Sequence, residues 1–351
     1  MQIGLFSNGN RNNALAKTSY DEDLHEVILA DRLGISEAWI SEHGTFLAYQ
    51  RPDQLPSADL FICKAAALTK QIRMGPGIRP LPFFHPLQIA TDCAVCDHLT
   101  DGRYIAGFGV GINAQSNKQR GTFAHDPRTM FREAVDLILK AWEAPAPFDW
   151  NGTVWQGEKW HIIPKPMTAL DVGIACSRSD TTLELTAEKG FLPLMSWTPT
   201  VPQVREMLSI YMSSEHKRGA APARSRARVG RVVYVCDSVA QAKRDLRDAE
   251  LRHAYNRMQH VLPPGGSNDD LTFEKLIDRG FFICGDPDTV YDGIKNVYDE
   301  VGGFGTLLLI YGKDWGTLER RCRSMERFMA EVAPRLAALD PDKPRVASAA
   351  E

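Results

Sequence analysis

Hydroxyl groups and one arginine are concentrated in residues 177–182, which read Ser-Arg-Ser-Asp-Thr-Thr. This run lies between an apolar segment, 172–176, and a stretch with helical spacing over 181–189. Backbone N–H groups at the start of a helix carry partial positive charge, so the run predicts an anion-binding turn. Arg178 would add a charge-assisted fork of hydrogen bonds to a phosphate. A plain helix cap made by Ser179 or Asp180 is the structural alternative.

A short apolar segment, residues 38–40, leads into Ser41-Glu42-His43. A histidine titrates near neutral pH and can donate or accept a proton, so the pair is a candidate for general acid/base chemistry. The structural alternative is that the same pair forms a solvated cap at the end of a strand. Further along, the glycines in Gly-Phe-Gly-Val-Gly, residues 107–111, form a tight turn or leave the backbone open to a flat ring.

The cysteines do not suggest a disulfide framework or a metal site. There are seven of them, an odd number without regular spacing, which is typical of reduced thiols in a cytoplasmic protein. Cys93 and Cys96 lie inside a helical pattern, so we interpret them as buried packing residues rather than redox or zinc ligands. His-x-His pairs and clustered carboxylates are missing at the expected strand ends, which disfavours a metal-dependent hydrolase, and no metal is expected.

These candidate residues must be positioned by elements that alternate along the chain. Short apolar runs and helical patterns follow one another about eight times, which predicts a parallel sheet covered by helices. Eight such units favour a closed (β/α)8 TIM barrel, in which the site lies at the C-terminal ends of the strands. The expected strands are residues 3–6, 38–40, 72–78, 104–111, 172–176, 192–197, 228–236, 281–284 and 306–311, and the expected helices are 21–33, 60–68, 86–99, 128–142, 181–189, 201–218, 239–257 and 318–339.

We expect residues 1–340 to form one barrel domain with two insertions. The first, about 143–166, is rich in proline and tryptophan and predicts a hairpin around Asn151-Gly152. The second, about 253–280, contains a polar, Pro/Gly-rich part from His260 to Asp278, which predicts a loop or lid over the pocket. The tail, 341–351, is expected to be disordered.

Composition limits the possible partners. Hydrophobic residues make up 44% of the 351 residues, enough for a large core, and the formal net charge is only -3. Neither nucleic acid nor an anionic membrane is therefore an expected partner. No apolar run reaches the ~20 residues of a membrane span, and the start of the chain lacks a charged leader, so we expect a soluble, cytoplasmic protein.

Several short motifs, in this order and spacing, resemble those of the bacterial luciferase-like flavin monooxygenases over nearly the whole chain. They are I-S-E-H-G-T-F, M-G-P-G-I-R-P-L-P-F-F-H-P, D-H-L-T-D-G-R-Y-I-A-G-F-G-V-G, A-C-S-R-S-D-T-T, F-L-P-L-M-S-W, C-G-D-P-D-T-V and M-A-E-V-A-P. The resemblance implies a TIM barrel that binds reduced FMN supplied by a separate NAD(P)H:flavin reductase. It also implies a flavin hydroperoxide, formed with O2, that inserts one oxygen atom into a small apolar organic substrate.

The resemblance also implies roles for particular residues. His43 is expected to act as acid or base on the oxygenated flavin, with Glu42 as its catalytic neighbour. Gly77-Ile78 matches a bulge that often contains a cis peptide and presses on the flavin ring. The full set of expected cofactor-binding residues is Phe6, Gly77, Ile78, Gly109, Ser177, Arg178, Ser179, Thr181, Ser196 and Trp197.

The chain departs from luciferase at places that bear on its activity. Gly44 stands where luciferase has a second histidine, and Gly109-Val110 replaces a cysteine and a phosphate-binding arginine. These changes argue against aldehyde luminescence, and they suggest that Arg178 takes over the phosphate. Two alternatives stay open, a deazaflavin-dependent dehydrogenase or reductase on the same barrel and a non-catalytic flavin-binding protein. A homodimer is expected, and the substrate is not identified by the sequence.

Overall fold

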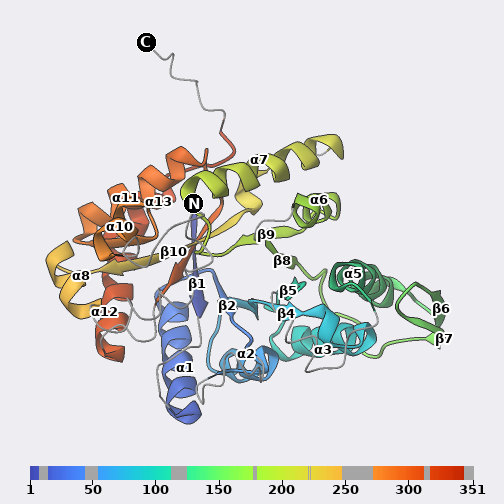
Figure 1. The fold of residues 1–351 in the computed structure, drawn as a ribbon. Helices are drawn as coiled ribbons and strands as arrows, with labels where there is room; N and C mark the ends of the chain where they lie inside the picture. The colour runs from blue at the N-terminus through green and yellow to red at the C-terminus, as the bar shows by residue number, and fades with distance from the viewer. Residues whose placement is uncertain are drawn as a thin grey trace. The chain divides into compact units, whose positions relative to one another are not determined.

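The structure is a computed structural model that describes residues 1–7, 15–43, 54–111, 125–176, 180–219, 221, 223–246, 272–311 and 317–343 (Figure 1). The chain divides into two compact units. Residues 5–175 form the N-terminal unit, and residues 1–4 together with 176–351 form the C-terminal unit. Strand β1 (Gln2–Ser7) contributes its first residues to the C-terminal unit and its last to the N-terminal unit. The single-domain interpretation of residues 1–340 stays a prediction.

Strands and helices alternate through the N-terminal unit. After β1 its elements are α1 (Ala16–Arg32), β2 (Glu37–Ile40), α2 (Ala58–Ala66), β3 (Arg73–Pro76), β4 (Arg79–Pro80), the 3₁₀ turn η2 (Leu81–Phe83), α3 (Pro86–Leu99), β5 (Ala106–Gly109), α5 (Pro127–Glu143), β6 (Phe148–Asn151), β7 (Gln156–Trp160) and β8 (Val172–Cys176). The pairs β2–β3, β4–β5 and β5–β8 are all parallel. The predicted parallel sheet is thus present in this unit.

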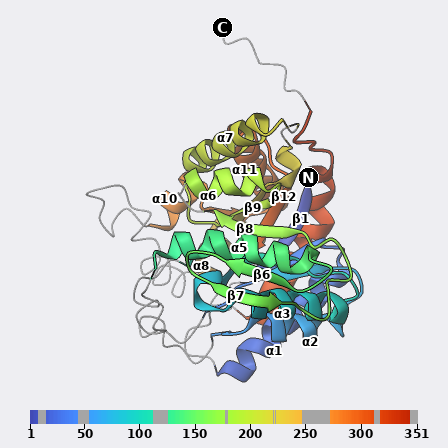
Figure 2. The same ribbon diagram turned by 90° about the vertical axis from the view of Figure 1, so that its right-hand side faces the viewer.

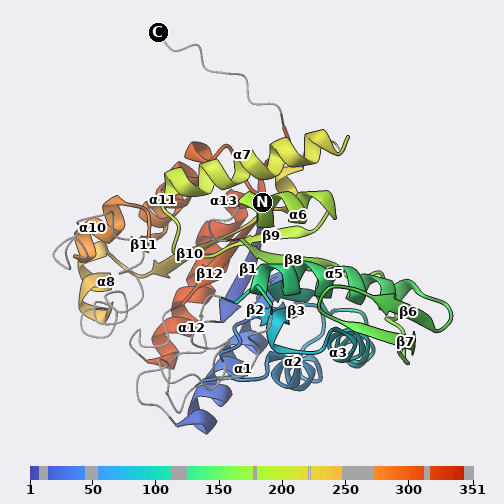
Figure 3. The ribbon, with the colours of Figure 1, turned by 45° about the vertical axis from the view of Figure 1, so that its right-hand side comes forward.

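The C-terminal unit continues the same alternation. Its elements are α6 (Asp180–Glu188), β9 (Leu192–Met195), α7 (Val201–Lys217), η3 (Arg224–Arg226), β10 (Arg228–Val235), α8 (Val239–Leu246), α10 (Phe273–Asp278), β11 (Phe282–Gly285), α11 (Pro287–Glu300), β12 (Thr306–Ile310), α12 (Leu318–Arg327), the π-helical turn η5 (Phe328–Val332) and α13 (Ala333–Ala337). Strand β10 pairs in parallel with β9, β11 and β12, and α6 packs beside α7 (Figure 3).

Local sequence explains where several of these helices begin and end. In Asp126-Pro127 and Asp286-Pro287 the aspartate side chain accepts two backbone N–H groups and proline occupies the first turn, so α5 and α11 start there. At the C-terminal end of α1, Gly34 has φ +81°, a backbone conformation that favours glycine and ends the helix.

The first insertion contains the predicted hairpin. Strands β6 and β7 are antiparallel, and Figure 2 shows them beside α5. Glu133 of α5 joins the two parts, because its carboxylate accepts N–H groups of Thr153, Val154 and Trp155, each at 2.9 Å, and the indole N–H of Trp150 at 3.2 Å. The hairpin is therefore anchored to the helix by the carboxylate of a single side chain.

The second insertion differs in part from the prediction. Residues 253–271 lie outside the described residues, but a loop over 272–278 is wrong, because Phe273–Asp278 forms helix α10. Thr272 caps the helix by accepting the N–H of Lys275, and Phe273 and Leu276 bury one face. Two apolar residues three apart are too short a pattern to stand out in a polar segment. Residues 344–351 of the expected disordered tail also lie outside the described residues.

Candidate active site

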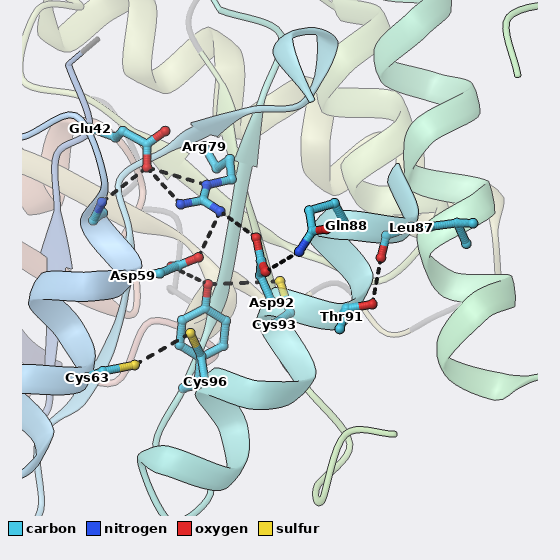
Figure 4. A network of polar contacts seen from close by, with 12 residues as sticks. Glu42, Asp59, Cys63, Arg79, Leu87, Gln88, Thr91, Asp92, Cys93 and Cys96 are labelled. Carbon is cyan, nitrogen blue, oxygen red and sulfur yellow. Dashed lines mark hydrogen bonds and ion pairs between the residues drawn. The ribbon is translucent and has the colours of Figure 1, made fainter. Parts of the chain in front are cut away.

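A buried arginine joins the C-terminal end of β2 to the start of β4 in the N-terminal unit. Arg79 is 6% exposed, and its Nη2 and Nε donate to Oε2 of Glu42 at 3.1 and 3.4 Å (Figure 4). The backbone N–H of Ala58, in the first turn of α2, donates to the same oxygen at 3.2 Å. Three donors therefore fix the carboxylate of Glu42 next to His43.

The same guanidinium contacts a second carboxylate. Arg79 Nη1 lies 2.9 Å from Oδ2 of Asp59 and 3.5 Å from Oδ2 of the half-buried Asp92. Tyr104 donates its hydroxyl to the other oxygen of Asp59 at 2.7 Å, and Phe84 lies with its ring centre 5.2 Å from the guanidinium carbon of Arg79. We call Glu42, Asp59 and Arg79 the carboxylate–arginine cluster.

Burial controls the ionisation of this cluster. Desolvation raises the pKa of both Glu42 and Asp59, although Arg79 opposes the rise at each. Burial by itself lowers the pKa of Arg79, but Asp59 and Glu42 more than offset it and raise that pKa above its ordinary value. Two carboxylates facing one cation hold a proton more tightly than exposed carboxylates do. The ionisation of Glu42 and Asp59 is therefore set by the balance between burial and the charge of Arg79.

His43 is held at its backbone, because its N–H donates to the carbonyl of Leu55 at 2.9 Å. Its side chain is half-buried. The position of His43 thus depends on two neighbours, the fixed carboxylate of Glu42 and the segment that leads into α2.

Four of the expected cofactor residues converge in the N-terminal unit. Gly77 and Ile78 are joined by a cis peptide bond, as the resemblance implied. A Cβ added at Gly77 would lie 2.9 Å from Cε2 of Phe6, and one added at Gly109 would lie 2.4 Å from Cδ1 of Ile78. The side chains of Phe6 and Ile78 therefore pack directly on Gly77 and Gly109, and Phe6, Gly77 and Ile78 stay partly exposed.

Fewer of the remaining candidates can be placed. Ser177, Arg178 and Ser179 lie outside the described residues. Thr181 occupies the first turn of α6 in the C-terminal unit. Ser196 and Trp197 follow the end of β9, and the Ser196 hydroxyl hydrogen-bonds that of Thr198 at 2.9 Å.

Sequence reasoning missed four polar residues that the structure buries: Asp59, Arg79, Tyr104 and Arg231. Only Arg231 had a local signal, because a charged residue interrupts the apolar strand Val229–Val235. In the described part of the chain, no three histidine, cysteine or acidic side chains are grouped to hold a metal ion. None of the described helices is long and apolar enough to span a membrane.

Comparison with known proteins agrees with this arrangement. The model of the luciferase-like monooxygenase family matches residues 1–303, so the chain belongs to that family. A 4-hydroxyprotoasukamycin monooxygenase from Streptomyces nodosus subsp. asukaensis is 30% identical over 330 residues, which cover 89% of this chain and 86% of the relative. The oxygenase component of a trigonelline monooxygenase from Acinetobacter baylyi is 29% identical over 43% of this chain and 41% of its own length.

Solved structures give the fold. The oxygenating constituent of 3,6-diketocamphane monooxygenase from Pseudomonas putida, in complex with FMN, aligns with a TM-score of 0.83 and 25% identity over 95% of this chain and 98% of that one. The predicted TIM-barrel fold of the luciferase-like monooxygenases is thereby confirmed. An F420-dependent secondary alcohol dehydrogenase aligns with a TM-score of 0.74 over 95% of this chain and 98% of its own, but at 15% identity it shares the fold alone.

Proposed function

We propose that this chain is the oxygenase component of a two-component, FMN-dependent monooxygenase. It receives reduced FMN from a separate NAD(P)H:flavin reductase and uses O2 to insert one oxygen atom into a small organic substrate. The observation that carries the proposal is the packing of Phe6 and Ile78 on Gly77 and Gly109 in the same unit as Glu42 and His43. The family membership and the FMN complex of the diketocamphane relative support the same cofactor.

The residues present fit FMN. Phe6 and Ile78, which are only partly buried and pack on Gly77 and Gly109, give a flat ring an apolar surface to stack against. In the C-terminal unit, Thr181 lies in the first turn of α6, and Ser177, Arg178, Ser179 and Thr181 are the residues expected to bind a phosphate. When bound, reduced FMN supplies the chemistry that activates oxygen and transfers one oxygen atom.

The chain's own residues control protons and water. His43 is placed to donate or accept a proton through its imidazole, and Glu42 is fixed by Arg79 and Ala58, so the pair does not reorient freely. The apolar residues Trp39 and Phe108, both fully buried, exclude water from the interior of the N-terminal unit. Water exclusion favours oxygen transfer over loss of hydrogen peroxide.

Anaerobic titration of the purified protein with reduced FMN tests the proposal, followed by mixing with oxygenated buffer and a screen of organic substrates. We expect tight binding of reduced FMN and substrate-dependent incorporation of one atom from ¹⁸O2. Binding of reduced deazaflavin in place of FMN would move the chain to the dehydrogenase alternative. Binding of FMN without oxygen transfer to any substrate would instead support a non-catalytic flavin-binding protein.

We also propose that the chain works in the cytoplasm as a homodimer. The proposal is supported by large apolar side chains on the surface of α2, its C-terminal end and α3. Leu60 is 75% exposed, Leu68 53%, Val95 38% and Leu99 60%. Exposed apolar side chains gathered on neighbouring helices are typical of a protein interface. A second copy of the chain is a partner of matching chemistry for this α2–α3 surface.

A further inference from the structure

The C-terminal unit contains a fully buried arginine in the middle of a strand. Arg231 is 0% exposed, and every residue of its strand β10 is buried. Its position can be compared with that of Arg79, which is similarly buried but contacts two buried carboxylates. Both arginines are therefore buried, but among the described residues only Arg79 contacts carboxylates.

Arg231 uses only part of its hydrogen-bonding capacity. Its Nη1 donates to the carbonyl of Gly230 at 2.7 Å, whereas Nε and Nη2 have no hydrogen-bond partner in the part of the chain that the structure describes. Burial lowers the pKa of Arg231 to about 10, so the side chain is still charged at neutral pH. Most buried polar groups in proteins are hydrogen-bonded, so two unpaired donors on a buried cation call for an explanation.

The two free donors have a specific geometry. Nε–H and Nη2–H point to the same side of the planar guanidinium and form the fork that accepts a carboxylate or phosphate with two parallel hydrogen bonds. The fork is complementary to an anionic group with two oxygens. A missing ligand of this kind would satisfy both donors and compensate the charge.

The strand of Arg231 also lies beside residues already expected in the pocket. Strand β9 pairs with β10 only at Leu194–Arg228 and Met195–Val229. The next residues of the chain, Ser196 and Trp197, then leave the pairing next to Gly230 and Arg231. A Cβ added at Gly230 would lie 3.2 Å from the backbone nitrogen of Trp197, which shows how close the two segments are. Arg231 therefore follows, in the same strand, a residue whose backbone lies against the expected flavin or substrate residue Trp197.

We infer that Arg231 binds the carboxylate of an organic-acid substrate through the free fork of its guanidinium. The inference rests on the proposed function and adds a chemical class to it: an apolar body carrying one acidic group. The phosphate of FMN has the same chemistry and is the other possible source of the anion. An experiment must therefore separate the two sources.

The experiment compares wild-type protein with Arg231→Met and Arg231→Lys, and uses Arg73→Met, which removes an exposed arginine, as the control. Benzoate serves as the carboxylate probe, measured by calorimetry on the cofactor-free protein. We expect Arg231→Met to weaken benzoate binding about 10- to 100-fold, Arg231→Lys to have an intermediate effect, and Arg73→Met to have none. Equal benzoate affinity in wild type and Arg231→Met would overturn the inference.

Two further measurements test whether Arg231 has a structural role and whether its anion is a substrate carboxylate or the FMN phosphate. An unpaired buried charge lowers stability, so the urea midpoint of cofactor-free Arg231→Met should equal or exceed that of wild type. A clear drop in that midpoint would make Arg231 a structural residue and overturn the inference. The ratio of FMN to riboflavin affinity should be unchanged by Arg231→Met, and a collapse of the ratio would assign the fork to the FMN phosphate instead. If no variant and not even wild type binds FMN, the proposed function fails while the benzoate result still stands.

Discussion

Arg79 contacts two buried carboxylates at once, and this makes it the residue whose loss should be felt most strongly in the N-terminal unit. Arg79→Gln would leave Glu42 and Asp59 buried without their cation, which should cost about 3–5 kcal/mol of unfolding free energy at neutral pH. Urea denaturation measures the loss. The control is Arg73→Gln, which breaks an exposed ion pair with Asp171 and should cost no more than about 1 kcal/mol.

The pH dependence of this loss has a definite sign. Both carboxyl pKa values are already raised by burial, and removal of Arg79 raises them further. An acid whose folded pKa is raised favours the folded state below its unfolded pKa, and that benefit is lost as pH rises through the folded pKa. The difference between wild type and Arg79→Gln should therefore shrink as the pH falls through the raised pKa values of Glu42 and Asp59, and it should be small by the ordinary carboxyl range. A difference that grows toward acid pH would contradict this account.

His43 can be tested separately from the cluster that surrounds its neighbour. With the imidazole removed in His43→Ala, product formation should fall by about 10²-fold, the usual contribution of a general acid or base. NADH consumption by the coupled reductase should continue and appear as hydrogen peroxide. His25→Ala, at an exposed position on α1, is the matched control. Unchanged product per NADH in His43→Ala would remove the proton-transfer role.

Some residues of the candidate site could be predicted from the sequence, and others could not. Glu42 and His43 were identifiable because they directly follow a strand and match a family motif. The role of Arg79 was hidden because it depends on Glu42, 37 positions earlier, and on Asp59 in another element. Pairs of residues far apart in the sequence leave no local pattern. The sequence therefore predicts Glu42 at the end of a strand but does not identify Arg79 as the partner of its carboxylate.

At the scale of elements, the close approach of β3 and β5 is set by glycine. A Cβ added at Gly107 would lie 1.8 Å from the backbone oxygen of Pro76, whereas at Gly109 the crowding atom is the movable tip of Ile78. Gly107→Ala should therefore destabilise the protein by about 3 kcal/mol or more, and Gly109→Ala by about 1 kcal/mol. Thermal and urea denaturation compare the two substitutions on one strand. Equal losses would show that backbone crowding is not what distinguishes them.

Helices α2 and α3 bring two thiols together. Cys63 Sγ lies 3.7 Å from Cys96 Sγ, and the hydrogen bond from Cys96 lowers the pKa of Cys63. Hydrogen peroxide should oxidise the Cys63 thiolate to a sulfenic acid, and attack by Cys96 should then release water and form a disulfide. Mass spectrometry should find a crosslinked peptide that dithiothreitol separates. Cys63→Ser should abolish the crosslink, and its persistence would show that another pair reacts.

The elements themselves were largely predictable, because apolar runs and capped helices are local features. The Asp-Pro starts of α5 and α11 and the hairpin β6–β7 follow directly from their residues. Helix α10 could not be predicted from its residues, because its stability comes from burying Phe273 and Leu276 against the rest of the unit. The sequence-derived helix at 318–339 is likewise interrupted by a π-helical turn, Phe328–Val332, just before Pro334, which has no backbone N–H to donate inside a helix.

At the scale of the whole molecule, assembly is the property that the α2–α3 surface makes testable. If this surface forms the proposed dimer, Leu60→Glu combined with Leu99→Glu should give a monomer, because burying two charges in an apolar interface is costly. Light scattering after size-exclusion chromatography measures the mass. Leu15→Glu, at a 72% exposed position away from these helices, should leave the mass unchanged. A double variant with the wild-type mass would place any interface elsewhere.

The distribution of the seven thiols has a practical consequence. Six are buried, and Cys63 on α2 is half-buried with a lowered pKa, so a maleimide fluorophore should attach there first. Cys63 lies one turn from Leu60. The emission of such a label would change whenever another chain covers these helices. The protein therefore carries, without any engineering, a single reactive position from which its association could be followed by fluorescence during turnover.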